Sequence, residues 1–91
     1  MMRDLRAKYD FIEKTWNLWE QSIGNETCWY LTITYFPSDG PREDYSFVGA
    51  TKEDCLFSTV TELDNAVRAW AYNPESSPFG RWLAIEKGWK L

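Results

Sequence analysis

The most regular hydrophobic pattern in the chain is residues 28–36, where β-branched and aromatic side chains follow one another without Gly, Pro or charge. Alternation divides this stretch into two faces. Trp29, Leu31, Ile33 and Tyr35 share one face, and the other mixes aromatic and hydroxyl side chains. Such a strand is typical of an antiparallel sheet with helices on one side. We therefore predict a strand whose first face points into the core.

Residues 3–23 are predicted to form an amphipathic helix, because apolar side chains recur at spacings of four and three. These positions are Leu5, Tyr9, Ile12, Trp16, Trp19 and Ile23. Gly24 would end the helix. A second apolar patch on the same helix, Ala7, Phe11 and Leu18, is either covered by another element or exposed for contact with a second copy.

Two more strands are predicted after residue 36. Residues 37–44 contain two prolines and an Asp-Gly pair, which predict a loop longer than a tight hairpin needs. Residues 45–50 and 55–60 are then predicted as strands, joined by a turn at 51–54. With residues 28–36 they would form a three-stranded meander.

Two helices are predicted to follow the strands. Thr61 would cap the first, and Asn73 with Pro74 would end it. Residues 78–87 fit a second helix that Ser77 caps, although their alternation also fits a strand. The predicted fold class is α+β, with an N-terminal helix, a three-stranded antiparallel meander and two C-terminal helices in a single domain over residues 1–91.

The composition favours a soluble chain with an ordinary core. Six Trp and 18% aromatic residues supply enough large side chains to build a core without disulfides or metal. Cys28 and Cys55 are expected to be buried free thiols. The charged N-terminus does not resemble a signal peptide, and no stretch is apolar enough for a membrane span, so we expect a cytoplasmic protein.

The formal net charge is −4, and it is unevenly distributed. Residues 24–77 carry nine acidic and three basic side chains, whereas the two ends of the chain are neutral or basic. This argues against direct binding of nucleic acid, which needs a basic footprint. It is compatible with a protein partner that has a basic surface.

Few catalytic groups are available. The chain has no histidine, which removes His-based acid–base chemistry, Ser-His and Cys-His pairs and most zinc sites. No phosphate-binding glycine loop is present, and no cofactor or metal ligand set is evident. Paired carboxylates remain, but nothing in the pattern marks one as held in an apolar pocket. We expect a protein that is not an enzyme.

A predicted acidic edge supplies the candidate contact residues. In the predicted meander, the third strand returns to the end of the sheet where the loop 37–44 lies. That path would bring acids of the loop close to acids at the start of the next helix. The candidate partner-binding residues are Asp39, Glu43, Asp44, Tyr45, Glu62 and Asp64. Such an edge is either a solubility feature or a docking site for a basic surface.

The leading hypothesis is therefore a small acidic protein-binding module. Such domains serve as inhibitors or decoys that cover the basic channel of a nucleic-acid-processing machine, as phage anti-defence proteins and CRISPR inhibitors do. One alternative is a toxin-immunity protein. Another is an assembly module that forms a homodimer through Ala7, Phe11 and Leu18.

Overall fold

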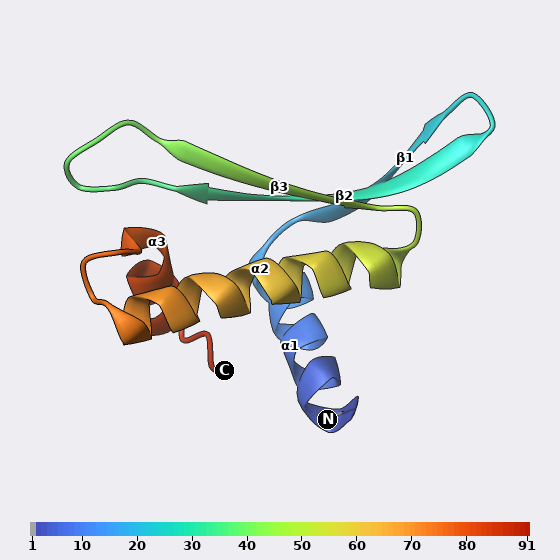
Figure 1. The fold of residues 1–91 in the computed structure, drawn as a ribbon. Helices are drawn as coiled ribbons and strands as arrows, with labels where there is room; N and C mark the ends of the chain where they lie inside the picture. Colours follow the sequence, from blue (N-terminus) through green and yellow to red (C-terminus); the bar gives the residue numbers. More distant parts are fainter. Residues whose placement is uncertain (1) are drawn as a thin grey trace. The chain divides into compact units, whose positions relative to one another are not determined.

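The computed structural model describes residues 2–91, and the side chains of residues 5–91 (Figure 1). Along the chain the elements are α1 (Met2–Thr15), β1 (Leu18–Ile23), β2 (Glu26–Tyr35), β3 (Glu43–Gly49), α2 (Lys52–Tyr72), α3 (Pro78–Arg81) and the π-helical turn η1 (Trp82–Glu86). The predicted α+β layout is confirmed: an N-terminal helix, a three-stranded antiparallel sheet and then two C-terminal helices.

The chain divides into two compact units, which we call the sheet unit and the helical unit. The sheet unit contains the described residues up to Thr34 together with Asp44–Val60. The helical unit contains Tyr35–Glu43 and Thr61–Leu91. α2 contributes its N-terminal part to the first and its C-terminal part to the second. A single domain over residues 1–91 stays a prediction.

The sheet has the order β1-β2-β3. β1 pairs antiparallel with β2, so that Leu18 lies opposite Leu31 and Ile23 lies opposite Glu26. Between β2 and β3, the side chain of Thr32 hydrogen-bonds with that of Ser46, and Thr34 with Asp44. These pairs run in opposite directions along the two strands, as an antiparallel ladder requires.

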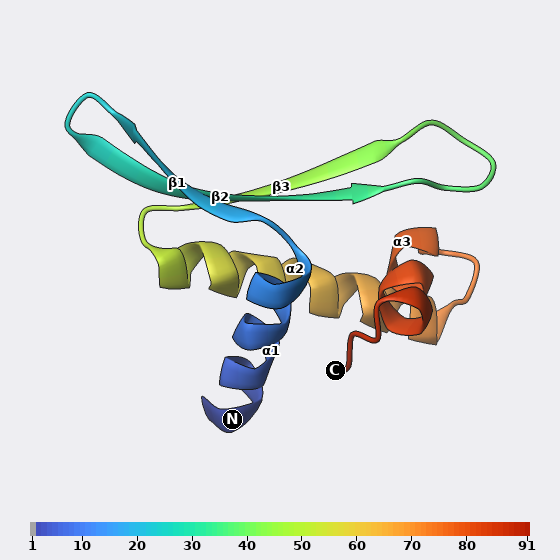
Figure 2. The ribbon, with the colours of Figure 1, turned by 180° about the vertical axis from the view of Figure 1, so that it is seen from behind.

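The predicted helix over residues 3–23 is wrong beyond Thr15, because residues 18–23 form β1. Gly24 does not end a helix. It is the first residue of the two-residue turn between β1 and β2, and its φ of 64° is the positive value that such a turn needs. Figure 2 shows the hairpin that β1 and β2 form. The helical spacing of Trp19 and Ile23 was outweighed by ladder hydrogen bonds and cross-strand contacts with β2.

The predicted strand over residues 55–60 is also wrong, because α2 already begins at Lys52 and continues through Thr61. Thr51 caps it: the Asp54 backbone N–H donates to Thr51 Oγ1 at 3.1 Å. The buried positions of α2 recur at helical spacing. They are Cys55, Leu56, Thr59, Val60, Leu63, Asp64 and Val67.

The core of the sheet unit lies against one face of the sheet. α1 and the first turns of α2 lie on the same side of that sheet (Figures 1 and 2). Leu31 and Ile33 have no exposed surface, and Phe47 of β3 is buried. The predicted inward face of residues 28–36 is therefore confirmed for Leu31 and Ile33, while Trp29 is half-buried. Tyr35, which belongs to the helical unit, is also buried, and its ring contacts Phe79 and Trp82 of that unit.

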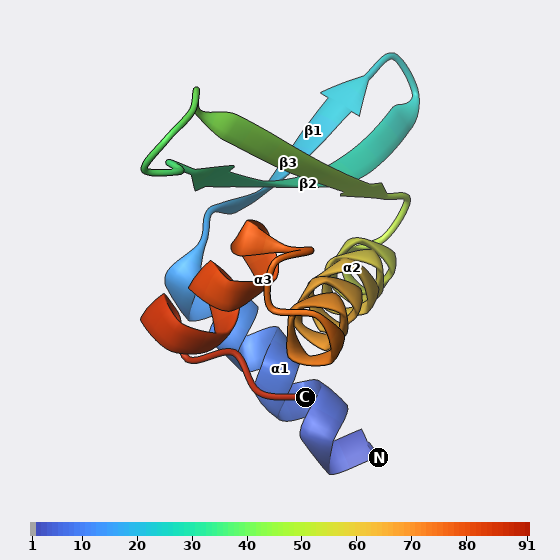
Figure 3. The ribbon, with the colours of Figure 1, turned by 60° about the vertical axis from the view of Figure 1, so that its left-hand side comes forward.

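The C-terminal segment is helical, which confirms the predicted helix and excludes the strand alternative. Ser77 Oγ accepts a hydrogen bond from the Gly80 backbone N–H at 3.0 Å. After η1, Gly88 has a φ of 77°, and the Trp89 N–H reaches the Leu83 carbonyl at 2.9 Å. A left-handed glycine followed by a backward hydrogen bond is typical of a Schellman motif; here the bond reaches six residues back, one more than in that motif, because the last turn is π-helical. Figure 3 shows α3 following the C-terminal end of α2.

Both cysteines are free thiols, as predicted. Cys55 is buried, and its thiol donates to the Phe47 carbonyl oxygen at 3.5 Å. Burial raises the pKa of this thiol. Cys28 is only half-buried, which corrects the expectation that both would be buried. Cys28 belongs to the opposite face of β2.

Candidate protein-binding face

The outer face of the sheet is the side opposite the helices of the sheet unit. Strand alternation and the pairing of the three strands place every second side chain there. We call this surface the open face. Its residues are Trp19, Gln21, Ile23, Glu26, Cys28, Tyr30, Thr32, Thr34, Asp44, Ser46 and Val48. All of them are exposed or half-buried.

An apolar row crosses the middle of the open face. Trp19 lies opposite Tyr30, and their rings are stacked with centroids 5.8 Å apart and an interplanar angle of 17°. Continuing the β2–β3 pairing places Val48 on the other side of Tyr30. Trp19 is 38% exposed and Val48 is 51% exposed. Large side chains in this position supply contact area for a partner.

Hydroxyl side chains and a carboxylate fill the part of the open face nearest the start of β3. The Thr34 hydroxyl donates to Asp44 Oδ1 at 2.9 Å, which holds that carboxylate on the sheet. The next pair toward the apolar row is Thr32 with Ser46. At the opposite end, Glu26 lies beside the β1–β2 turn. The apolar row therefore lies between two carboxylates.

The charge of the open face has one sign. Glu26 and Asp44 are its charged residues, and neither Lys nor Arg is among them. A cationic side chain of a partner could meet either carboxylate, and it could also lie over the face of an aromatic ring. Base stacking on Trp19 and Tyr30 would lack the cations that nucleic-acid-binding sheets use for phosphates.

The six residues predicted as an acidic edge differ in how exposed they are. Asp39, Glu43 and Glu62 are exposed, and Tyr45 is half-buried. Asp64 is only 8% exposed, and its Oδ1 accepts a hydrogen bond from Trp89 Nε1 at 2.9 Å. Its carboxylate therefore has a structural role within the helical unit.

Of the six predicted contact residues, only Asp44 belongs to the open face. The third strand that was expected to bring the acids together is absent, since residues 55–60 are part of α2. That all six residues share one edge stays a prediction, but the strand from which it was inferred is absent.

The apolar patch predicted from Ala7, Phe11 and Leu18 does not exist as a helix face. Leu18 belongs to β1, where it lies opposite Leu31. Phe11 packs against Trp16, with ring centroids 6.0 Å apart. The homodimer hypothesis therefore loses the surface on which it was based.

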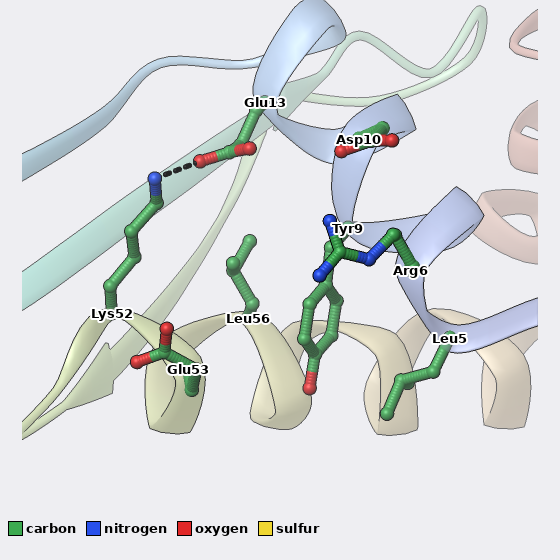
Figure 4. Close-up of a pocket in the computed structure, with 8 residues that line it drawn as sticks. All are labelled: Leu5, Arg6, Tyr9, Asp10, Glu13, Lys52, Glu53 and Leu56. Carbon is green, nitrogen blue, oxygen red and sulfur yellow. Dashed lines mark ion pairs between the residues drawn. The ribbon is translucent and has the colours of Figure 1, made fainter. Parts of the chain in front are cut away.

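A shallow groove of about 280 Å³ lies between α1 and the start of α2 (Figure 4). Its lining residues are Leu5, Arg6, Tyr9, Asp10, Glu13, Lys52, Glu53 and Leu56. Lys52 and Glu13 form an ion pair, and Glu13 raises the pKa of Lys52.

Tyr9 is a second side chain of the groove whose pKa is shifted by its surroundings. Burial raises the pKa of Tyr9, and Glu53 and Asp54 raise it further. Both effects favour the protonated phenol over the phenolate. The groove is lined by charged side chains of both signs.

The sequence analysis missed the residues that make the open face. The spacing of Trp19 and Ile23 predicted a helix stripe, and Tyr30 belonged to the second, mixed face of residues 28–36. One signal was present: Gly24-Asn25, a pair that favours a two-residue hairpin turn, comes directly before the strand-forming run 26–35.

Several other site types are not found in the part of the chain that the structure describes. Within residues 5–91, no three His, Cys, Asp or Glu side chains are grouped so that they could hold a metal ion. No helix among residues 2–91 combines the length and apolar character of a membrane span. Neither a protein-family model, nor a curated protein, nor a solved structure matches this chain.

Proposed function

We propose that this chain is a non-enzymatic protein-binding module that takes a basic partner on its open face. One observation carries the proposal: the residues of the open face include an aromatic pair at the centre and a carboxylate toward each end, and neither Lys nor Arg is among these strand residues. Interfaces of this kind combine aromatic anchors with a polar rim. The single sign of charge supplies steering toward a basic surface.

We propose further that the partner is a nucleic-acid-processing machine and that the chain inhibits it as a decoy. Basic channels that hold nucleic acid are the strongest cationic surfaces that such a face would meet. An acidic module seated there would exclude the nucleic acid. Phage anti-defence proteins, including CRISPR inhibitors, belong to this functional class, and the argument for membership is one of shared charge and size.

Reversing the charge of the open face should weaken capture of the partner. The partner is first identified by pull-down from the source cell and mass spectrometry. The variant Glu26→Lys/Asp44→Lys is then expected to lower its affinity about tenfold or more, because both carboxylates become repulsive. The effect should shrink as salt is raised, since exposed charges are screened. Binding is measured by surface plasmon resonance at several salt concentrations.

Two matched variants control for net charge and test the predicted acidic edge. Glu75→Lys/Glu86→Lys makes the same change in charge outside the open face, and it should leave affinity nearly unchanged. Asp39→Lys/Glu62→Lys reverses two exposed residues of the predicted edge. Equal losses from all three variants would mean that only net charge matters, and the proposal would then be wrong. A loss confined to Asp39→Lys/Glu62→Lys would move the site to the edge.

A further inference from the structure

We infer that the partner presents a helix to the open face, lying along β2, with a cationic side chain near each end and apolar side chains in its middle. This inference rests on the proposed function and adds the shape and spacing of the partner's contact segment. The observations behind it are the pairing of the strands and the positions of Glu26, Asp44 and the Trp19–Tyr30 pair.

The backbone of the bound segment favours a helix. A segment that lies on the face of a sheet receives no ladder hydrogen bonds, because the sheet's own backbone groups point along the sheet. An extended segment would therefore bury peptide groups without partners, which is costly. A helix satisfies its backbone internally. The opposite face of this same sheet is already covered by helices.

The dimensions of the open face also fit a helix. Around Tyr30, where all three strands overlap, the outer strands lie about 10 Å apart, and a helix with side chains is about 10–12 Å across. Trp19 on β1 and Val48 on β3 flank Tyr30 on β2, so the apolar row spans this width. A helix along β2 would rest on that row at its midpoint.

The spacing of the two carboxylates sets the spacing of the partner's cations. Glu26 and Thr34 are eight positions apart on β2, and Asp44 hydrogen-bonds with Thr34. At about 3.4 Å per residue, positions 26 and 34 are about 27 Å apart along the backbone of β2. A helix covers that distance in about 18 residues, or about five turns. Because 18 residues make five whole turns, the second cation lies on the same side of the helix as the first.

The same geometry sets the apolar positions of the partner. Tyr30 lies midway between Glu26 and Thr34 on β2. On a helix, the residues about 7 and 11 positions after the first cation bracket this midpoint and face the same side. The expected segment therefore has a cation, two apolar residues and a second cation on one stripe. Its middle contacts Trp19 and Tyr30, and its ends meet Asp44 and Glu26.

Two synthetic helical peptides test this inference on the full chain. Both are alanine-rich and carry two Arg and two Leu. In the in-phase peptide the Arg residues are about 18 positions apart, with Leu about 7 and 11 positions after the first. In the out-of-phase peptide one Arg is moved by two positions, which turns it to the opposite side. We expect the in-phase peptide to bind about tenfold more tightly.

NMR titration of the ¹⁵N-labelled protein is the readout. The in-phase peptide should shift the Trp19 indole resonance, which the variant Trp19→Phe assigns. In the variant Glu26→Gln/Asp44→Asn, the two peptides should bind alike. Equal binding to the unaltered protein would overturn the inference, and so would a preference that survives in that variant.

An extended, proline-containing peptide with Arg residues about eight positions apart is the third probe. Tighter binding of this probe would overturn the helix in favour of an extended partner.

Failure of this inference can be told from failure of the proposed function. If both helical peptides bind alike but Glu26→Lys/Asp44→Lys still abolishes partner capture, only the helical spacing is wrong. If that variant captures the partner normally, the open face is not the site, and both proposals fall. A shift of the Trp19 resonance by single-stranded DNA, with no response to either peptide, would also overturn both.

Discussion

Replacing Ile33 with Ala should lower the free energy of unfolding by about 2–5 kcal/mol, the range for truncating a fully buried aliphatic side chain. Ile33 has no exposed surface and lies on the inward face of β2. The change removes apolar contacts and leaves a cavity between the sheet and the helices of the sheet unit. A domain of this length has a total stability of about 5–14 kcal/mol, so the loss is a large fraction. Chemical denaturation followed by circular dichroism measures it.

Ile23→Ala is the matched control for Ile33→Ala. Ile23 is in a neighbouring strand but is 66% exposed, on the open face. Its replacement should cost less than about 1 kcal/mol, which is the span of strand propensity. A cost below about 0.5 kcal/mol at Ile33, or a larger cost at Ile23, would mean that the two faces of the sheet have been exchanged.

Replacing Gly80 with Ala should destabilise the helical unit by about 3 kcal/mol, at the upper end of the range for overpacking. A Cβ at this position would lie 2.0 Å from the carbonyl oxygen of Ala66 in α2 and 2.9 Å from Ser77 Oγ. The first of these atoms is backbone, which cannot rotate away. α3 would have to move, and the hydrogen bond between Gly80 and Ser77 would be lost. Thermal unfolding and the near-ultraviolet signal of the tryptophans report the change.

Gly40→Ala controls for the loss of a glycine. At Gly40 the nearest atom to an added Cβ is Pro37 Cγ at 3.9 Å, an ordinary contact. This variant should unfold within about 0.5 kcal/mol of the unaltered protein. If Gly80→Ala is equally stable, the close approach of α3 to α2 is not present in solution.

The sequence predicted elements well where one local pattern dominated. The inward face of β2 follows from its alternation, and the C-terminal helix follows from Ser77 and Gly88, which satisfy its end groups. Gly80, which counts against a helix by propensity, is required by the packing of α3 on α2. That requirement depends on a residue distant in sequence, so no local pattern could have shown it.

The candidate site was harder to predict, because it depends on which strands pair. Trp19 fits both a helix stripe and a strand, and only the pairing of β1 with β2 decides between them. Residues 55–60 look like a strand by composition, yet Thr51 and the helical spacing of the buried positions make them part of α2. Residues 18–23 form a strand and residues 55–60 do not. The strand that was expected to bring the acidic residues together is therefore absent, and β1 instead forms part of the open face.

A photo-crosslinking amino acid placed at Ser46 tests the open face most directly. Ser46 is exposed near the centre of that face, and Tyr72, which is 93% exposed on α2, carries the same group in a control protein. After irradiation in the source cell, the Ser46 protein should be covalently joined to one basic protein, and the Tyr72 protein should not. Crosslinking of that protein from Tyr72 and not from Ser46 would show that the partner binds elsewhere.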